Sequence, residues 1–326
     1  MEHARLGAGN YLISRVGFGC APISGYDYGP VDETAWIATV RAALDNGIDF
    51  FDVADVYGFG RGEELLSYAL GEQRHKVALA TKFGLVWDSH GAVSRDSSPE
   101  RIRHALNESL RRLRVDSITL YQLHWPDGVT PLDAVLEVLE RFREEGKIQF
   151  MGLSNVSVGQ LESVCPAHRI DSVQAAYNLL CRGIEDTFMT WCDAKGASLL
   201  AHSGLARGLL SGKRSQDFHF EGLDTRGRSA YFADSGREEK QQLIKALFEV
   251  GERVGCSPSA VALRWLLDHR AVTSVLVGMK GVAQLEENLR AVGWRLSNDD
   301  YQRLSSLSAS CPGSLAGSLA QRGSQP

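Results

Sequence analysis

Residues 101–155 read "RIRHALNESLRRLRVDSITLYQLHWPDGVTPLDAVLEVLERFREEGKIQFMGLSN", and they alternate two kinds of pattern. In 101–113 and 131–145, apolar side chains recur every three or four positions, which predicts two amphipathic helices. Residues 118–124 and 150–154 are short and largely apolar, as expected of strands buried on both faces of a parallel sheet. The alternation of helices with buried strands indicates an α/β protein.

The same alternation extends over the rest of the chain. Each strand-like run is followed by a helix-like segment, and no obvious linker interrupts the series. This series favours a closed (β/α)8 TIM barrel in a single domain, residues 1–311, over an open sheet with a second domain. The expected strands are 16–19, 50–52, 77–82, 118–124, 150–154, 172–176, 198–201 and 274–277.

Three segments fall outside these repeats. Residues 1–14 predict a small hairpin that turns near Gly9 and Asn10 and covers one end of the barrel. Residues 211–236 form a long polar loop after the seventh strand, and a loop of this length is often functional. Residues 312–326 are poor in large apolar side chains, so we expect a disordered tail.

Composition excludes several classes of function. The chain carries 35 basic and 40 acidic residues, a net charge of −5, which does not suggest a nucleic-acid surface. Its six cysteines form no C-x-x-C pair, which favours reduced thiols over disulfides or a zinc site. We find neither a signal peptide nor an apolar run of membrane-spanning length. We therefore expect a soluble, cytoplasmic protein.

Titratable side chains follow three consecutive strands of the predicted barrel. Asp52 ends the second strand, Lys82 the third and His124 the fourth, while Tyr57 lies in the loop that leaves the second. Because barrel enzymes place their chemistry at the carboxyl ends of the strands, we expect these four groups at one mouth.

These four groups together can handle a proton. Tyrosine is a poor acid, with a pKa of about 10, but a lysine ammonium nearby stabilises the phenolate and lowers that value. Asp52 would hold Lys82 charged and in place, and His124 could hydrogen-bond a substrate oxygen. The result is a general acid for an oxygen that gains negative charge, as a carbonyl does when hydride attacks it.

Each residue also has a structural interpretation. Asp52 and Lys82 could form a structural ion pair, His124 could belong to the core, and Tyr57 could be a packing residue. Asp55 is expected to be a solvated loop residue. The occurrence of all four in strand order favours the catalytic interpretation.

Seven motifs, quoted at the end of this paragraph in chain order, together resemble the aldo-keto reductase family. The resemblance is to the bacterial branch of that family that is similar to the potassium-channel β-subunits. The similarity spans roughly residues 12–308. It implies a (β/α)8 barrel that binds NADP(H) across its mouth without a Rossmann fold, and in "GFGRGE" Glu63 indeed replaces the third glycine of that fingerprint. The motifs are "FFDVADVYGFGRGEE", "VALATKFG", "YQLHWPD", "MGLSNVS", "VQAAYNLL", "GLARGLLSGK" and "VLVGMKGVAQLEENL".

The resemblance also implies roles for individual residues. Tyr57 would be the general acid/base, Lys82 and Asp52 its tuning pair, and His124 the group that orients the carbonyl. Cofactor contacts would be Ser154, Asn155 and Gln174 at the nicotinamide carboxamide, Ser203, Leu205 and Lys213 at the pyrophosphate, and Gly278, Lys280, Gln284, Glu287 and Asn288 at the adenosine end.

The cofactor site departs from the family pattern at several positions. His202 stands where a tyrosine or tryptophan usually stacks on the nicotinamide, and Gly204 replaces a proline. Cys20 and Ala21 stand where Thr-Trp is common, which should open the pocket floor. Lys280 is the only basic residue between the last strand and the last helix, so it predicts a modest preference for NADPH, with NADH also possible.

The resemblance indicates an NADP(H)-dependent reductase of aldehydes or ketones that needs no metal. Tyr26, Tyr28, Trp87 and Trp125 are candidates for the substrate pocket, or else they pack under loops. Three alternatives stay open. They are an NAD(P)-dependent sugar or polyol dehydrogenase, a non-catalytic subunit that senses the cofactor, and a metal-dependent barrel isomerase.

Overall fold

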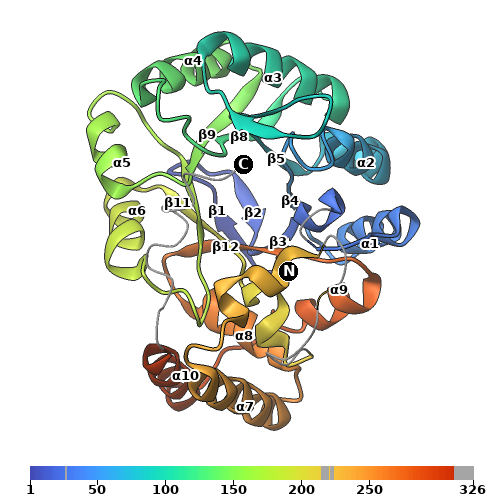
Figure 1. The fold of residues 1–326 in the computed structure, drawn as a ribbon, viewed down its shortest axis with the longest axis vertical. Coiled ribbons are helices and arrows are strands. Elements are labelled where there is room, and N and C mark those ends of the chain that lie inside the picture. The colour runs from blue at the N-terminus through green and yellow to red at the C-terminus, as the bar shows by residue number, and fades with distance from the viewer. Residues whose placement is uncertain (26–27, 214–219, 221–223, 312–326) are drawn as a thin grey trace.

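Eight parallel strands close into a barrel in the computed structural model, which describes residues 1–25, 28–213, 220 and 224–311. The strands follow the order β10-β11-β12-β3-β4-β5-β8-β9 around the barrel (Figure 1), which confirms the predicted fold class. They are β3 (Val16–Gly19), β4 (Phe50–Asp52), β5 (Ala78–Phe83), β8 (Ile118–Leu123), β9 (Ile148–Ser154), β10 (Ser172–Ala176), β11 (Ser198–His202) and β12 (Val272–Gly278).

Helices surround this barrel on its outside (Figure 1). The two helices predicted at 101–113 and 131–145 are present as α3 and α4. Among the described residues, no helix has the length and apolar character to cross a membrane. The helices are α1 (Glu33–Asp45), α2 (Arg61–Leu70), α3 (Pro99–Leu113), α4 (Leu132–Glu144), α5 (Val158–Val164), α6 (Thr190–Lys195), α7 (Arg237–Val254), α8 (Pro258–Asp268), α9 (Val282–Leu289) and α10 (Asn298–Ser310).

Local sequence signals explain where helix α3 begins and ends. Pro99 occupies the first turn, where the missing N–H costs no hydrogen bond. The helix ends at Arg114, whose backbone is left-handed. Between them Ile102, Leu106 and Leu113 are fully buried in the layer between helices and barrel. The amphipathic pattern of the sequence thus sets which face of α3 covers the barrel.

The N-terminal residues form the predicted hairpin, β1 (His3–Arg5) paired with β2 (Leu12–Ser14). Leu6 and Ile13 are fully buried against the inward side chains of the barrel strands, including Phe50 and Leu120. The hairpin therefore closes one end of the barrel and leaves the other end for a site.

A second hairpin, β6 (Leu85–Trp87) with β7 (Val93–Arg95), follows β5 and was not predicted. Its two strands have three residues each, half-buried in β6 and exposed in β7, so the sequence carries little periodic signal there. Within the predicted 211–236 loop, short helical turns form at Thr225–Arg228 and Ala230–Phe232. Tyr26, the tail 312–326 and part of that loop lie outside the described residues.

Candidate active site

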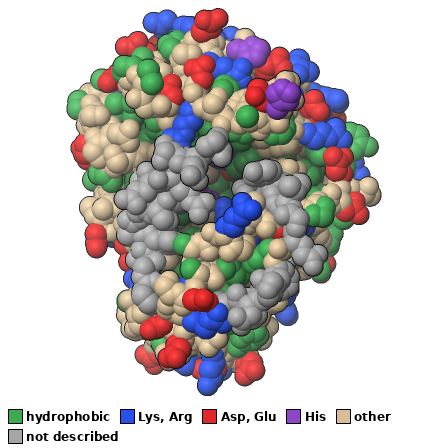
Figure 2. Space-filling view, in the orientation of Figure 1, with side chains coloured by type: hydrophobic (Ala, Val, Ile, Leu, Met, Phe, Trp, Pro, Cys, Tyr) green, Lys and Arg blue, Asp and Glu red, His purple; other side chains and the backbone are tan. Residues whose placement is uncertain are grey.

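The carboxyl ends of the strands open into a cavity of about 1790 Å³. In the space-filling view this face is hollowed near its centre, and hydrophobic side chains show inside the hollow (Figure 2). The volume exceeds the roughly 300–1,000 Å³ of a typical small-ligand site, so it has room for a dinucleotide together with a substrate. Predicted residues that line it are Ala21, Tyr28, Asp52, Tyr57, His124, Trp125, Ser154, Asn155, Gln174, His202, Ser203, Leu205, Lys213, Gly278, Lys280, Gln284, Glu287 and Asn288.

A buried ion pair lies at the cavity wall, which Asp52 lines. The Lys82 ammonium is 2.5 Å from Asp52 Oδ1 and also donates to the Val53 carbonyl oxygen at 3.0 Å. The two charged side chains are 1% and 6% exposed. Asp52 Oδ2 accepts hydrogen bonds from Gln122 at 3.1 Å and Gln174 at 2.9 Å. Such a pair tolerates burial because every charged atom is hydrogen-bonded.

Tyr57 and His124 complete the group of four side chains. The Lys82 ammonium is 5.3 Å from the centroid of the Tyr57 ring. The Tyr57 and His124 rings meet edge to face, with their centroids 6.1 Å apart. The structure thus brings together, at one mouth of the barrel, all four residues predicted to handle the proton. We call Asp52, Tyr57, Lys82 and His124 the tetrad.

The position of Tyr57 follows from the tight turn between β4 and α2. The Tyr57 N–H donates to the Ala54 carbonyl oxygen at 3.1 Å. A Cβ atom at Gly62 would lie 2.9 Å from the Tyr57 carbonyl oxygen, so only glycine lets α2 start this close to the turn. Strained backbone recurs around the cavity, because Phe59, Asn155, Ser203 and Arg207 line it with positive φ. Such strain is typical of functional sites.

Both histidines at the mouth are neutral near pH 7. Burial and the nearby Lys82 ammonium hold the pKa of His124 well below its usual value. Burial, Lys82 and Arg207 lower the pKa of His202 to about 4. His124 Nδ1 is buried and has no hydrogen-bond partner among the described residues, while His202 Nδ1 is 3.0 Å from Ser203 Oγ. A neutral imidazole can still donate a hydrogen bond through one ring nitrogen.

The three residues predicted at the nicotinamide carboxamide are connected to the tetrad. Ser154 Oγ donates to the Gln174 carbonyl oxygen at 3.0 Å. Asn155 Nδ2 donates to the His124 carbonyl oxygen at 2.8 Å. Together with the bond from Gln174 to Asp52, these contacts link one end of the cavity to the buried ion pair.

The other end of the cavity is built around Lys280. Its ammonium donates to the carbonyl oxygens of Tyr28 at 2.5 Å and Pro30 at 3.2 Å. The main-chain N–H of Lys280 donates to Gln284 Oε1 at 2.8 Å. Lys213 forms an ion pair with Glu287 across the same region. Lys280 therefore ties the segment after β3 to the beginning of α9.

Sequence reasoning missed three residues of this region. Gln122 is a fully buried amide bound to Asp52, and an amide in an otherwise apolar strand two residues before His124 is a signal that could have found it. Arg207 and Arg226 line the cavity, with guanidinium groups 5.9 and 5.6 Å from the Tyr28 ring. Arg207 lies inside the quoted motif "GLARGLLSGK", whereas Arg226 lies in a loop without periodic pattern.

Two of the candidate residues do not line the cavity. Cys20 is fully buried and does not line the cavity, although Ala21 does. Trp87 is also outside the cavity wall and instead packs on Phe59, with ring centroids 5.7 Å apart. Trp125 does line the cavity, and its ring is covered by the Arg95 guanidinium at 4.6 Å.

The expectation that Asp55 is solvated is wrong. This side chain is 1% exposed because helices α2 and α3 cover the loop on which it lies. Burial and the charge of Glu63 raise the pKa of Asp55 to about 8. In the described part of the chain, no group of three or more His, Cys, Asp and Glu side chains is placed to hold a metal ion.

The chain is similar to proteins of one family over nearly its whole length. The model of the aldo/keto reductase family matches residues 15–309. Aldo-keto reductase YhdN from Bacillus subtilis (strain 168) is 34% identical over 310 residues, which cover 94% of this chain and 93% of the relative. Probable aldo-keto reductase 1 from Glycine max is 28% identical over 305 residues, covering 93% of this chain and 88% of the relative.

Solved structures show the same similarity. The glycerol dehydrogenase AKR11B4 from Gluconobacter oxydans superposes with a TM-score of 0.87 at 34% identity, covering 95% of this chain and 96% of the other. The holo form of the aldo-keto reductase AKR11C1 from Bacillus halodurans gives a TM-score of 0.81 at 27% identity, covering 94% and 96%.

Proposed function

This chain belongs to the aldo/keto reductase family and is an NAD(P)-dependent carbonyl oxidoreductase, and from this premise we propose that Tyr57 is its general acid. We propose further that it reduces an aldehyde or ketone with NADPH as the preferred cofactor. The observation that carries the proposal is the position of Tyr57 at the cavity mouth, between the buried Lys82–Asp52 pair and the neutral His124.

The cavity fits an extended nicotinamide dinucleotide. Its volume exceeds that of a small-ligand site. At Gly278, which lines it, a Cβ atom would lie 2.7 Å from Pro22 Cγ, so glycine lets Pro22 pack closely against this wall. When bound, the reduced nicotinamide supplies the hydride. In our proposal Ser154, Asn155 and Gln174 hold its carboxamide. Ser203, Leu205, Lys213 and Arg207 face the pyrophosphate, and Gly278, Lys280, Gln284, Glu287 and Asn288 face the adenosine end.

In the proposed mechanism, side chains of the protein then transfer the proton to the substrate. As the substrate oxygen gains negative charge, the Tyr57 hydroxyl donates its proton to that oxygen. The Lys82 ammonium stabilises the phenolate that remains, and Asp52 keeps the ammonium charged and oriented. His124, held neutral by its surroundings, donates a hydrogen bond to the same substrate oxygen and fixes its position.

The oxidative direction is the second candidate function. The observation that favours it is the structural similarity to the glycerol dehydrogenase AKR11B4 at 34% identity. The same side chains would serve in reverse, with Tyr57 as phenolate accepting the alcohol proton. Rates with NADPH and a panel of aldehydes and ketones, compared with rates for NADP⁺ and a panel of polyols, decide between the directions. If none of these substrates changes the absorbance of the reduced nicotinamide, the catalytic proposal is wrong.

Replacing Lys280 tests the proposed preference for NADPH. A 2′-phosphate needs positive charge nearby, and here it would meet the Lys280 ammonium and the beginning of α9. Lys280→Met should weaken NADPH binding by about 1.5–3 kcal/mol, the range for hydrogen bonds to charged groups. NADH binding should hardly change. Titration of each cofactor, followed by quenching of protein fluorescence, measures both affinities.

The matched control is Lys245→Met, which removes a lysine from the exposed face of α7. It should leave both affinities unchanged. Since Lys280 also contacts the carbonyl oxygens of Tyr28 and Pro30, an equal loss for NADPH and NADH would assign it to loop anchoring and remove it from the phosphate site.

A further inference from the structure

A buried polar cluster lies behind the turn that carries Tyr57, outside the tetrad. At its centre is Asp55, which is 1% exposed. Apart from weak main-chain support from the Val56 N–H, neither carboxyl oxygen has a hydrogen-bond partner among the described residues. A buried ionised carboxylate in this state would be costly, so the neutral acid is favoured.

Charged and titratable groups face Asp55 from each element packed around it. Glu63 on α2 is fully buried and accepts hydrogen bonds from Thr81 at 2.6 Å and from Arg112 at 2.7 Å. Arg112 and Arg101 come from α3. Tyr121 comes from β8, and its hydroxyl has no partner among the described residues. Glu63 engages the guanidinium of Arg112, and the charge of Glu63 raises the pKa of Asp55 by more than the charge of Arg112 lowers it.

The backbone around Asp55 connects this cluster to the tetrad. The Asp55 N–H points to the Lys82 carbonyl oxygen at 3.4 Å, and the Lys82 ammonium donates to the Val53 carbonyl oxygen at 3.0 Å. Two residues after Asp55, the Tyr57 N–H closes the turn on Ala54. Asp55 thus lies on the turn that is hydrogen-bonded to Lys82 and that carries Tyr57.

We propose that Asp55 is a positioning residue whose neutral form leaves the turn bearing Tyr57 undisturbed, and that its ionisation lowers the rate of carbonyl reduction. This inference rests on the proposed role of Tyr57. Two physical effects act in the same direction. An anion here would oppose formation of the Tyr57 phenolate, and it would compete with Glu63 for the Arg112 guanidinium.

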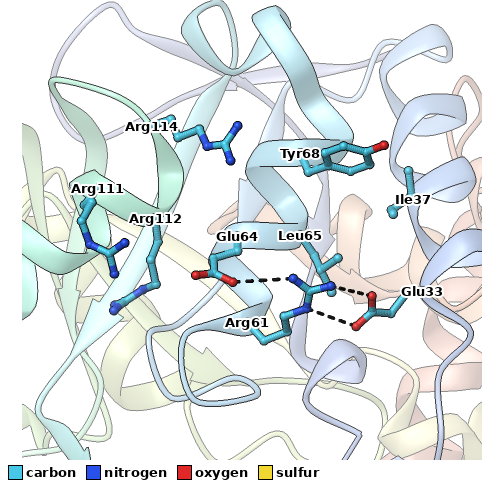
Figure 3. A pocket seen from close by; sticks show the side chains of 9 residues that line it. All are labelled: Glu33, Ile37, Arg61, Glu64, Leu65, Tyr68, Arg111, Arg112 and Arg114. Carbon is cyan, nitrogen blue, oxygen red and sulfur yellow. Dashed lines mark hydrogen bonds and ion pairs between the residues drawn. The ribbon is translucent and has the colours of Figure 1, made fainter.

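Movement of Arg112 would reach the turn directly. A Cβ atom at Gly60, the residue before α2, would lie 3.0 Å from Arg112 Cδ, so the two are in close contact. Figure 3 shows Arg112 beside Arg111 and Glu64, where a pocket opens on the outer surface of α1, α2 and α3. Arg112 therefore separates the buried cluster from solvent, and Glu63 holds it in that place.

Asp55→Asn tests the proposal because the amide keeps the shape of the neutral acid and cannot ionise. The pKa of Asp55 is about 8, so at pH 9 about a tenth of the wild-type molecules carry the neutral acid. If only these molecules turn over, kcat of the wild type at pH 9 is about a tenth of its value at low pH. The ratio of kcat at pH 9 to kcat at pH 6 should therefore be about tenfold higher in Asp55→Asn than in the wild type.

Thermal unfolding between pH 5 and pH 9 gives a readout that does not depend on activity. Asp55 has a raised pKa in the folded protein, so the folded state binds more protons than the unfolded state between about pH 4 and pH 8. Stability from this group is present below its unfolded pKa and is lost as the pH rises towards 8. The Tm of the wild type should fall over this range, and the Tm of Asp55→Asn should fall less.

Asp45→Asn, the same change at an exposed carboxyl at the end of α1, is the control and should follow the wild type in both measurements. Parallel pH profiles of kcat for wild type and Asp55→Asn would overturn the proposal, as would a folded but inactive Asp55→Asn. If the wild type reduces no carbonyl but the Tm profiles differ as expected, the proposed function fails while the titration of Asp55 stands. If the Tm profiles coincide, the titration itself is refuted.

Discussion

Tyr57→Phe is expected to lower kcat for carbonyl reduction by a factor on the order of 10²–10⁴, the usual contribution of a positioned general acid. The substitution removes the transferable proton and keeps the ring, so the edge-to-face contact with His124 can persist. NADPH affinity should therefore stay close to the wild-type value. Stopped-flow measurement of a single turnover, with excess aldehyde added to the enzyme–NADPH complex, isolates the chemical step.

Tyr68→Phe provides the matched control, because it makes the same chemical change at a tyrosine that is 60% exposed on α2. This control should turn over at the wild-type rate. A Tyr57→Phe variant that keeps more than about a third of the wild-type single-turnover rate would falsify the assignment of Tyr57 as general acid.

Lys82→Met is expected to cause a large fall in kcat and to change the pH profile. Without the ammonium beside it, Tyr57 should titrate closer to the free value of about 10. In the oxidative direction the phenolate is the reactive form, so loss of the charge should move the alkaline optimum upward. Profiles of kcat for alcohol oxidation in wild type and variant measure this shift. An unchanged profile would leave Lys82 as a structural ion-pair partner only.

The same substitution leaves Asp52 as a buried carboxylate without its cation, so stability must be measured alongside activity. Removing one partner of a buried ion pair typically costs about 3–5 kcal/mol. The double variant Lys82→Met with Asp52→Asn should recover part of that loss in urea unfolding. It should not recover activity, because the charge that stabilises the Tyr57 phenolate is still missing. Recovery of both together would mean that Lys82 acts on folding alone.

Sequence reasoning predicted the barrel and the tetrad because both depend on local patterns. A buried strand of three to seven residues is largely apolar, and the topology of the barrel then places Asp52, Lys82 and His124 at one mouth. The hairpin β6–β7 was missed because each of its strands has only three residues, half-buried in β6 and exposed in β7. Its fold depends on pairing with the neighbouring strand, which leaves no periodic signal.

Asp55 shows why a local interpretation can fail. Three residues beyond a strand, in a segment with glycines, an aspartate is ordinarily solvated. Asp55 is buried beside helices α2 and α3, which carry its charged neighbours Glu63 and Arg112. The packing of those helices cannot be predicted from residues 50–60 alone. Lys280 is similar, since its ammonium contacts Tyr28 and Pro30 about 250 positions earlier in the chain.

The most direct test of the account follows the hydride itself. The wild type is mixed with NADPH carrying deuterium at both C4 positions of the nicotinamide and with an aldehyde that it consumes, and the product alcohol is analysed by mass spectrometry. Direct transfer predicts one deuterium on the former carbonyl carbon, at a rate that Tyr57→Phe lowers and Tyr68→Phe leaves unchanged. An alcohol without deuterium, or a deuterated alcohol formed equally fast by all three proteins, would contradict the account.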